Sequence, residues 1–253
     1  MVEAATTGES VLALSNVFRF AKYLDAFRGL FARHTDWSMA RIEWADPLRE
    51  DRHGMVKTYD PSVPVFVDVL PHVISILDSL RPNAELVYRR LSVERGGQDV
   101  KIEMTFDGRP CRVELGRNQD RRRRLFEFLT GDGSLTLDFA TEPGVARLGD
   151  QVFGGSAFQH PGPLTCQALA FLADPTDPRL SPAIGTQTCR LVDEMLPHYV
   201  SESDAWLDAA HSGIDAATEL QVQYAHLERD ARRFIPSPAS LGLYRKPIVG
   251  QKN

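Results

Sequence analysis

The spacing of hydrophobic residues changes several times along the chain, and each change predicts a different element. Residues 11–18 and 38–47 alternate apolar and polar positions as strands do, whereas residues 19–34 repeat aromatic and leucine positions at helical spacing. Residues 48–63 are polar and carry no periodicity, so we expect a long loop there. Loops of this length in compact domains are usually lids, binding loops or disordered segments.

The middle of the chain consists of alternating segments that follow one another almost without interruption. Tight turns with the sequences GGQ, DGR and GDG join several of them, which indicates an antiparallel meander. One face of such a sheet packs on a core, and the other is solvated or covered by a partner. The predicted fold class is α+β, with an open, mainly antiparallel sheet of about six strands and helices packed on one face. The expected meander strands are residues 84–96, 99–108, 109–116, 124–131 and 133–140.

Helical spacing returns after the meander. We expect helices over residues 162–174 and 182–200, and a last helix that begins with Ser203 as its N-cap and carries one apolar stripe. Packing on the core is the favoured interpretation of this stripe. We assign residues 1–200 to one α+β domain, and residues 201–253 to a C-terminal helix and an irregular tail packed on the same domain.

Composition and charge narrow the class of protein. The chain has 253 residues, of which 43% are hydrophobic and 25% charged, as is usual for globular proteins. A formal net charge of −5 argues against general nucleic-acid binding. The basic run at residues 121–124 leads into a strand, and we interpret it as a solvated strand end rather than an anion site.

Three cysteines without CxxC spacing fit a reducing cytoplasm. No signal peptide and no apolar run of about 18 residues is present, so we expect no membrane contact.

The segment VFVDVLPHVISIL, residues 65–77, is almost entirely apolar but contains Asp68 and His72 four residues apart. Within a helix this spacing places both side chains on one face. Pro71 favours a helix that starts near Pro71 itself, with His72 in the first turn and Asp68 on the preceding bend. Either geometry lets a carboxylate orient an imidazole for general acid–base catalysis near neutral pH. The alternative is a core histidine that Asp68 caps, and the residues by themselves favour this alternative.

A second polar cluster lies in and beside the expected loop. Its side chains would face a substrate if the loop folded over the face of Asp68 and His72, although charged loops are usually just solvated. The candidate substrate-binding residues are Asp46, Arg52, His53, Lys57 and Tyr59. The sequence has no HExxH, paired CxxC or GxSxG motif, so we expect neither a metal site nor a serine-hydrolase site.

Four short motifs follow one another in an order known from one enzyme family: VFRF at 17–20, DVLPH at 68–72, TFDGR at 105–109 and LTGDGSLTLDF at 129–139. Through them, residues 11 to about 200 resemble the C-terminal, substrate-binding half of the Gfo/Idh/MocA oxidoreductases. The resemblance implies that Asp68 and His72 correspond to the family's D-x3-H pair, whose histidine transfers the proton. Two features differ from the family pattern: Ser75 stands where an acidic residue is frequent, and no glycine lies between Asp68 and His72.

The nucleotide-binding half of that family requires a strand, a glycine-rich turn and a helix. Only ten residues precede residue 11, and neither G-x-G-x-x-G nor the family's E-K-P motif with its catalytic lysine occurs in the sequence. We therefore expect the substrate-binding half alone, with no cofactor bound by this chain.

Three hypotheses for the function follow from this resemblance. The first is a cofactor-independent acid–base enzyme, of the dehydratase, isomerase or cyclase type, that acts on a small polar metabolite. The second is the substrate-binding subunit of a split oxidoreductase, in which a nucleotide-binding partner chain supplies NAD(P). The third is a non-catalytic binding or assembly protein, which is less favoured because a scaffold has no need of the D-x3-H pair. The resemblance also implies a homodimer through the open sheet face.

Overall fold

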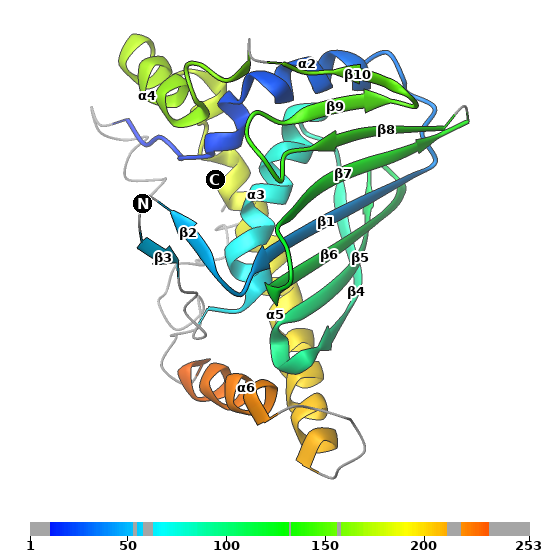
Figure 1. Ribbon diagram of the computed structural model, residues 1–253, viewed down its shortest axis with the longest axis vertical. Coiled ribbons are helices and arrows are strands. Elements are labelled where there is room, and N and C mark those ends of the chain that lie inside the picture. The colour runs from blue at the N-terminus through cyan, green and yellow to red at the C-terminus, as the bar shows by residue number, and fades with distance from the viewer. Residues whose placement is uncertain are drawn as a thin grey trace, which may run out of the picture.

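The computed structural model describes residues 11–52, 55–57, 63–131, 133–155, 158–211 and 219–232, with the side chains of a few of these left out of the description. Eight strands form one sheet in the order β10-β9-β8-β7-β1-β6-β5-β4 (Figure 1). Strands β1 and β6 are parallel, and every other neighbouring pair in this sheet is antiparallel. The strands are β1 (Met39–Pro47), β4 (Leu86–Glu94), β5 (Asp99–Phe106), β6 (Arg109–Gln119), β7 (Arg123–Thr130), β8 (Gly133–Asp138), β9 (Val145–Leu148) and β10 (Gln151–Phe153).

The predicted α+β class and the predicted meander are confirmed. The sheet has eight strands rather than about six, because β9 and β10 follow the meander and were not expected from the sequence. They contain only four and three residues, so neither is long enough to display the alternation that identified the other strands.

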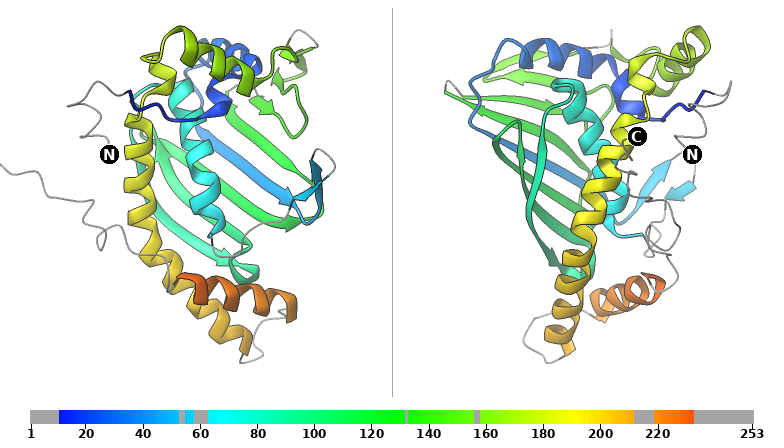
Figure 2. Two further views of the ribbon diagram at one scale, coloured as in Figure 1. Left: turned by 90° about the vertical axis from the view of Figure 1, so that its left-hand side faces the viewer. Right: turned by 180° about the vertical axis from the view of Figure 1, so that it is seen from behind.

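Helices cover one face of the sheet and leave the other face open, as Figure 2 shows. The helical elements are η1 (Val17–Phe20), α2 (Lys22–Phe31), α3 (Val65–Leu80), η2 (Arg95–Gly97), α4 (Pro163–Ala173), η4 (Pro178–Leu180), α5 (Ala183–His211) and α6 (Glu219–Arg232). The alternation of β1 sorts its side chains between the two faces, since Ala40, Ile42 and Trp44 are buried against the helices. None of the described helices is both long and apolar enough to cross a membrane.

Helix α3 begins after Pro64, so the prediction that it would start near Pro71 is wrong. Pro71 is the seventh residue of the helix, and its missing N–H removes one hydrogen bond, the one that the carbonyl of Val67 would accept. Burial offsets this loss because most of the helix is apolar on all sides, with Phe66 and Leu70 fully covered. As a result, Asp68 and His72 are one turn apart within a regular helix.

Two other predictions for the N-terminal region need correction. Residues 11–18 form no strand: Leu14 donates one backbone bond to Leu180 O at 2.8 Å, no ladder follows among the described residues, and the chain turns into η1. The expected loop at 48–63 contains a small hairpin of β2 (Glu50–Arg52) and β3 (Met55–Lys57). Residues 53–54 and 58–62 lie outside the described residues.

The C-terminal helices also differ from the prediction. Ser203 is not an N-cap but lies inside α5, only 2% exposed, because the buried stripe of that helix continues through Tyr199 to Leu207. The expected single last helix is instead the end of α5 followed by α6, which packs against Gly96 and Gly97 of η2. The boundary placed at residue 200 falls within α5, and the expected tail lies outside the described residues.

Candidate active site

His72 projects from the middle of α3 into a group of aromatic rings. Its imidazole stacks on Trp44 of β1, with ring centroids 5.6 Å apart and planes 10° from parallel. The ring of Phe18 from η1 meets the imidazole edge-on at 5.4 Å. Phe139 completes the group through contacts with both Phe18 and Trp44. Three distant parts of the chain therefore hold the plane of this half-buried imidazole.

Asp68 lies one turn before His72 and binds an arginine. Its carboxylate accepts a hydrogen bond from Arg117 Nη2 at 2.8 Å, and the side chain of Asp68 is 46% exposed whereas that of Arg117 is 1% exposed. Arg117, at the end of β6, also donates to the carbonyl of Val63 at 2.6 Å. The pair therefore joins the sheet to the first turn of α3, where a carboxylate is also favoured by the helix dipole.

Asp46, predicted to bind substrate, lies on the buried face of β1. Its carboxylate is 4% exposed and forms an ion pair with Arg124, whose side chain is 3% exposed. Arg124 also donates to two backbone carbonyls, and its guanidinium carbon lies 4.1 Å from the centre of the Trp44 ring. The interpretation of residues 121–124 as a solvated strand end is therefore wrong for Arg124. The role of Asp46 toward substrate remains a prediction, while its contacts favour a structural role.

The remaining predicted substrate-binding residues belong to the β2–β3 hairpin and the segments around it. Arg52 and Lys57 are in the paired strands of the hairpin, but their side chains are outside the described structure, as are His53 and Tyr59 altogether. Glu50 of the hairpin accepts a hydrogen bond from Arg122 at 3.1 Å, which ties the hairpin to the start of β7. The contact of Arg52, His53, Lys57 and Tyr59 with a substrate remains a prediction.

A hollow of about 560 Å³ adjoins the aromatic group around His72, and Phe18 is the residue that belongs to both. Polar groups enter it from Arg122 and Glu142, and Glu142 accepts a hydrogen bond from Tyr23 at 2.9 Å. Burial, and secondly the nearby carboxylate of Glu142, raise the pKa of Tyr23, so this hydroxyl stays protonated and cannot serve as a base at neutral pH. The hollow is lined by Val17, Phe18, Arg122, Glu142, Pro143, Gln159, Gly162, Pro163 and Leu164.

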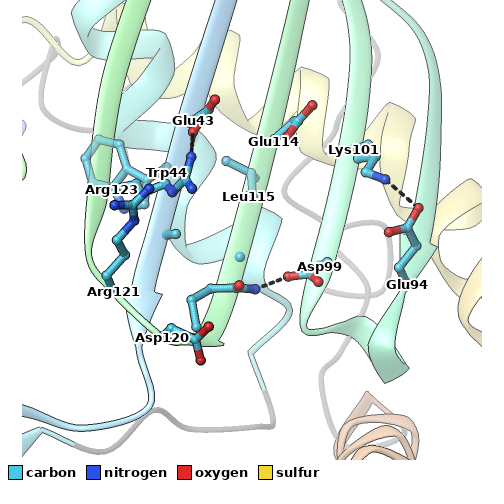
Figure 3. Close-up of a pocket in the computed structure, with 13 residues that line it drawn as sticks. Glu43, Trp44, Glu94, Asp99, Lys101, Glu114, Leu115, Asp120, Arg121 and Arg123 are labelled. Atoms are coloured by element: carbon cyan, nitrogen blue, oxygen red, sulfur yellow. Dashed lines mark hydrogen bonds and ion pairs between the residues drawn. The ribbon is translucent and has the colours of Figure 1, made fainter. Parts of the chain in front are cut away.

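A second hollow, of about 570 Å³, opens on the other side of the sheet and is shown in Figure 3. Its charges are largely paired with one another: Arg123 binds Glu43, and Lys101 binds Glu94 at 2.6 Å. Burial raises the pKa of Asp99, which accepts a hydrogen bond from Gln119. Among the residues that the structure describes, no histidine lines this hollow, which belongs to the open face on which a dimer contact was expected.

The sequence suggested Asp68 and His72 as a catalytic pair, which remains a prediction, but it did not indicate what they contact. The sequence did not indicate that Arg117 and Arg124 are buried, because an arginine at a strand end is commonly solvated. Trp44 could have been found, because the alternation of residues 38–47 places it on the same face as Asp46. Among the described residues, no group of His, Cys, Asp and Glu is arranged to hold a metal ion.

No family model and no curated protein matches the sequence. Solved structures do match. UDP-N-acetylglucosamine 3-dehydrogenase from Acidithiobacillus ferrooxidans superposes with a TM-score of 0.61 at 16% identity, over 81% of this chain and 65% of that protein. A 3-ketoreductase from Actinomadura kijaniata gives 0.57 at 12% identity, over 78% and 64%. An inositol dehydrogenase homolog from Azotobacter vinelandii gives 0.56 at 13% identity, over 78% and 64%.

These structures are oxidoreductases of the Gfo/Idh/MocA type, so the resemblance expected from the sequence motifs is confirmed at the level of the fold. The chain spans about 65% of the length of the structures it matches. At 12–16% identity the match establishes the fold and not the reaction.

Proposed function

We propose that this chain is a proton-transfer enzyme that acts on a small polyhydroxylated metabolite, such as a sugar or a cyclitol, in a redox-neutral dehydration, isomerisation or cyclisation. The observation that carries the proposal is the position of His72: an imidazole held between Trp44 and Phe18, one helical turn from Asp68. Phe18 in turn lines a hollow large enough for a small molecule. The substrate class draws on the neighbours, which are named for sugars and inositol.

In this mechanism His72 removes a proton from a hydroxyl group or from a carbon next to a carbonyl, and its imidazolium returns the proton to another atom of the same substrate. An isomerisation then needs no other reactant, and in a dehydration the returned proton leaves with a hydroxyl as water. An imidazole suits both half-reactions because it changes protonation near neutral pH. Trp44 keeps the ring plane fixed, and the Asp68–Arg117 pair holds the first turns of α3 to the sheet.

The second candidate is the substrate domain of an NAD(P)-dependent oxidoreductase. The described residues do not fit a dinucleotide: the sheet is almost wholly antiparallel, and no strand runs through a glycine-rich turn into a helix that could receive a pyrophosphate. A nucleotide domain would therefore have to come from elsewhere. Exposed apolar side chains favour such a partner: Met55 and Val56 of the hairpin and Leu164 and Leu172 of α4 are exposed. The hairpin and α4 lie on the same side of the sheet as α3 (Figure 1).

The experiment that separates these candidates follows solvent exchange. The purified chain is incubated in D2O with a panel of keto-sugars and keto-cyclitols, and loss of the C–H signal next to the carbonyl is recorded by proton NMR with and without NAD(H) or NADP(H). Exchange without nucleotide supports the redox-neutral enzyme. Exchange or turnover that appears only with nucleotide, or only with an added nucleotide-binding chain, supports the second candidate.

The decisive variant is His72→Ala, which should lower the exchange rate by about 10²–10⁴ because general acid–base groups contribute that much. His198→Ala is the matched control: this exposed histidine of α5 packs against Tyr88 of β4, and its replacement should leave the rate unchanged. If His72→Ala keeps the rate of the original chain, or if it loses cooperative unfolding, then the imidazole is a core residue. Absence of exchange with every substrate and nucleotide would favour a non-catalytic binding protein.

A further inference from the structure

A third hollow, of about 620 Å³, lies where α2, the C-terminal end of α3 and the N-terminal end of α5 meet. Four arginines and one carboxylate, that of Asp78, line this hollow. We call it the arginine hollow; its charged lining residues are Arg19, Arg28, Asp78, Arg179 and Arg190. The proposed function assigns no role to any of these residues.

Arg19 is the deepest of the four, with a side chain only 10% exposed. Its Nη2 lies 3.1 Å from Asp78 Oδ2, but its buried Nε has no hydrogen-bond partner among the residues that the structure describes. Burial lowers the pKa of Arg19, Asp78 opposes this effect, and Arg28 and Arg179 add to it. A buried guanidinium with an unused donor is costly, so an anion in the hollow that Arg19 lines would stabilise its charge.

The other three arginines leave positive charge at the rim. Arg179 is held in a fork by Asp177, at 2.7 Å for Nη2, and lies 4.4 Å from the centre of the Phe20 ring, so its position is fixed. Arg28 pairs with Asp25 at 3.1 Å in a contact that is about half exposed and therefore weak. Arg190 is exposed and forms no ion pair or hydrogen bond with any described residue.

Asp25, Asp78 and Asp177 each pair with one arginine, whereas Arg190 forms no ion pair with a described residue; the acidic residues Asp193 and Glu194 follow it one turn later on α5. The N-terminus of α5 adds positive potential to the hollow. The helix contains 29 residues and starts at Ala183, which lines the hollow next to Ile184. Free N–H groups and the helix dipole at such an end favour anions.

We propose that the arginine hollow binds a phosphate-bearing small molecule. A phosphate accepts several hydrogen bonds at once, which matches the forked donors of arginine, and the volume leaves room for more than the phosphate itself. This hollow and the one beside Phe18 share no lining residue, and Asp78 lies six residues beyond His72 on α3, about 9 Å along the helix axis. In η1, Phe18 packs on His72 whereas the next residue, Arg19, reaches the arginine hollow.

Calorimetric titration of the chain with inorganic pyrophosphate, at constant ionic strength, tests this proposal. We expect saturable binding that Arg190→Ala weakens about tenfold, since a hydrogen bond to a charged group is worth at least that factor. Arg147→Ala is the matched control, because Arg147 on β9 is also exposed and unpaired among the described residues but lies away from the hollow. Its affinity should stay within about twofold of the original chain.

Three results would overturn the proposal. The first is absence of saturable binding at millimolar pyrophosphate. The second is an equal loss of affinity in Arg147→Ala and Arg190→Ala, which would mean diffuse attraction by the whole surface. The third is binding of the chain to anionic phospholipid vesicles that pyrophosphate does not displace, which would identify the arginines as a membrane-headgroup surface. Because Arg190 is exposed, its substitution should leave the folded structure intact, and circular dichroism checks this.

Discussion

Replacing Asp46 by alanine is the substitution whose outcome the structure predicts most sharply. It removes one partner of an ion pair in which both side chains are at least 96% buried. Removing one member of such a pair typically costs about 3–5 kcal/mol, because a buried charge is left behind. Arg124 would keep the carbonyls of Ala45 and Arg123, at 2.6 and 2.7 Å, so we expect the lower end, about 3 kcal/mol.

Urea unfolding followed by circular dichroism measures this free energy, and the midpoint should fall without a change in slope. In a chain of this size, 3 kcal/mol corresponds to a melting temperature about 6–12 °C lower. Glu94→Ala is the control: its partner Lys101 is 2.6 Å away, but the two side chains are 49% and 50% exposed. Screening by solvent should keep that loss below about 1 kcal/mol.

The opposite result would refute the structural reading of Asp46. If Asp46→Ala unfolds within about 1 kcal/mol of the original chain and yet abolishes substrate binding, then the carboxylate serves the substrate, as the sequence suggested. Asp46→Asn adds a second check, because the amide keeps an oxygen that accepts from Arg124 but carries no charge. It should fall between the original chain and the alanine variant in stability.

Three further predictions concern other parts of the fold. Asp68→Ala should cost about 2 kcal/mol in urea unfolding because it takes the carboxylate from the buried Arg117, and Asp68→Asn should cost about half as much. Gly97→Ala should speed amide hydrogen exchange in α6, because Gly97 has φ of +88° and an added Cβ would lie 2.5 Å from Glu228 Oε2. Gly108→Ala is the control: Gly108 has φ of +76° but open space around it, so this substitution should leave the exchange in α6 unchanged. If the open sheet face forms a dimer, analytical ultracentrifugation should give twice the chain mass of 28.3 kDa. Glu114→Arg on that face should then shift the mass toward the monomer. A monomer at every concentration would count against the dimer contact.

The meander could be predicted because its information is local. Strand β5 alternates over its whole length and β6 alternates as far as Leu115, and an Asp–Gly turn with positive φ at both residues joins them, so sequence neighbours are also neighbours in space. The placement of β1 could not be predicted in this way. It lies between β6 and β7, parallel to one and antiparallel to the other, and its partners are about 70–90 residues away in the chain.

In the candidate site, too, local features could be predicted from the sequence and long-range contacts could not. The four-residue spacing allowed Asp68 and His72 to lie one turn apart in a helix, as they do, but the favoured prediction placed Asp68 on a bend before the helix. The spacing could not show what each side chain contacts. Arg117 reaches Asp68 from 49 residues away, and Arg124 reaches Asp46 from 78 residues away. Pro71 was read as a helix start because local rules weigh the lost hydrogen bond and not the burial of the surrounding apolar residues.

Trp44 connects the stability of the domain to the geometry of its proposed acid–base group. One ring contacts the guanidinium of Arg124 and the imidazole of His72, so the ion pair of Asp46 and Arg124 fixes the ring on which the imidazole stacks. A loss of activity in Asp46→Ala would therefore not by itself identify a substrate ligand. Trp44→Phe distinguishes the two causes: it keeps the ion pair but reduces the stacking surface, and it should lower proton exchange with less loss of stability than Asp46→Ala.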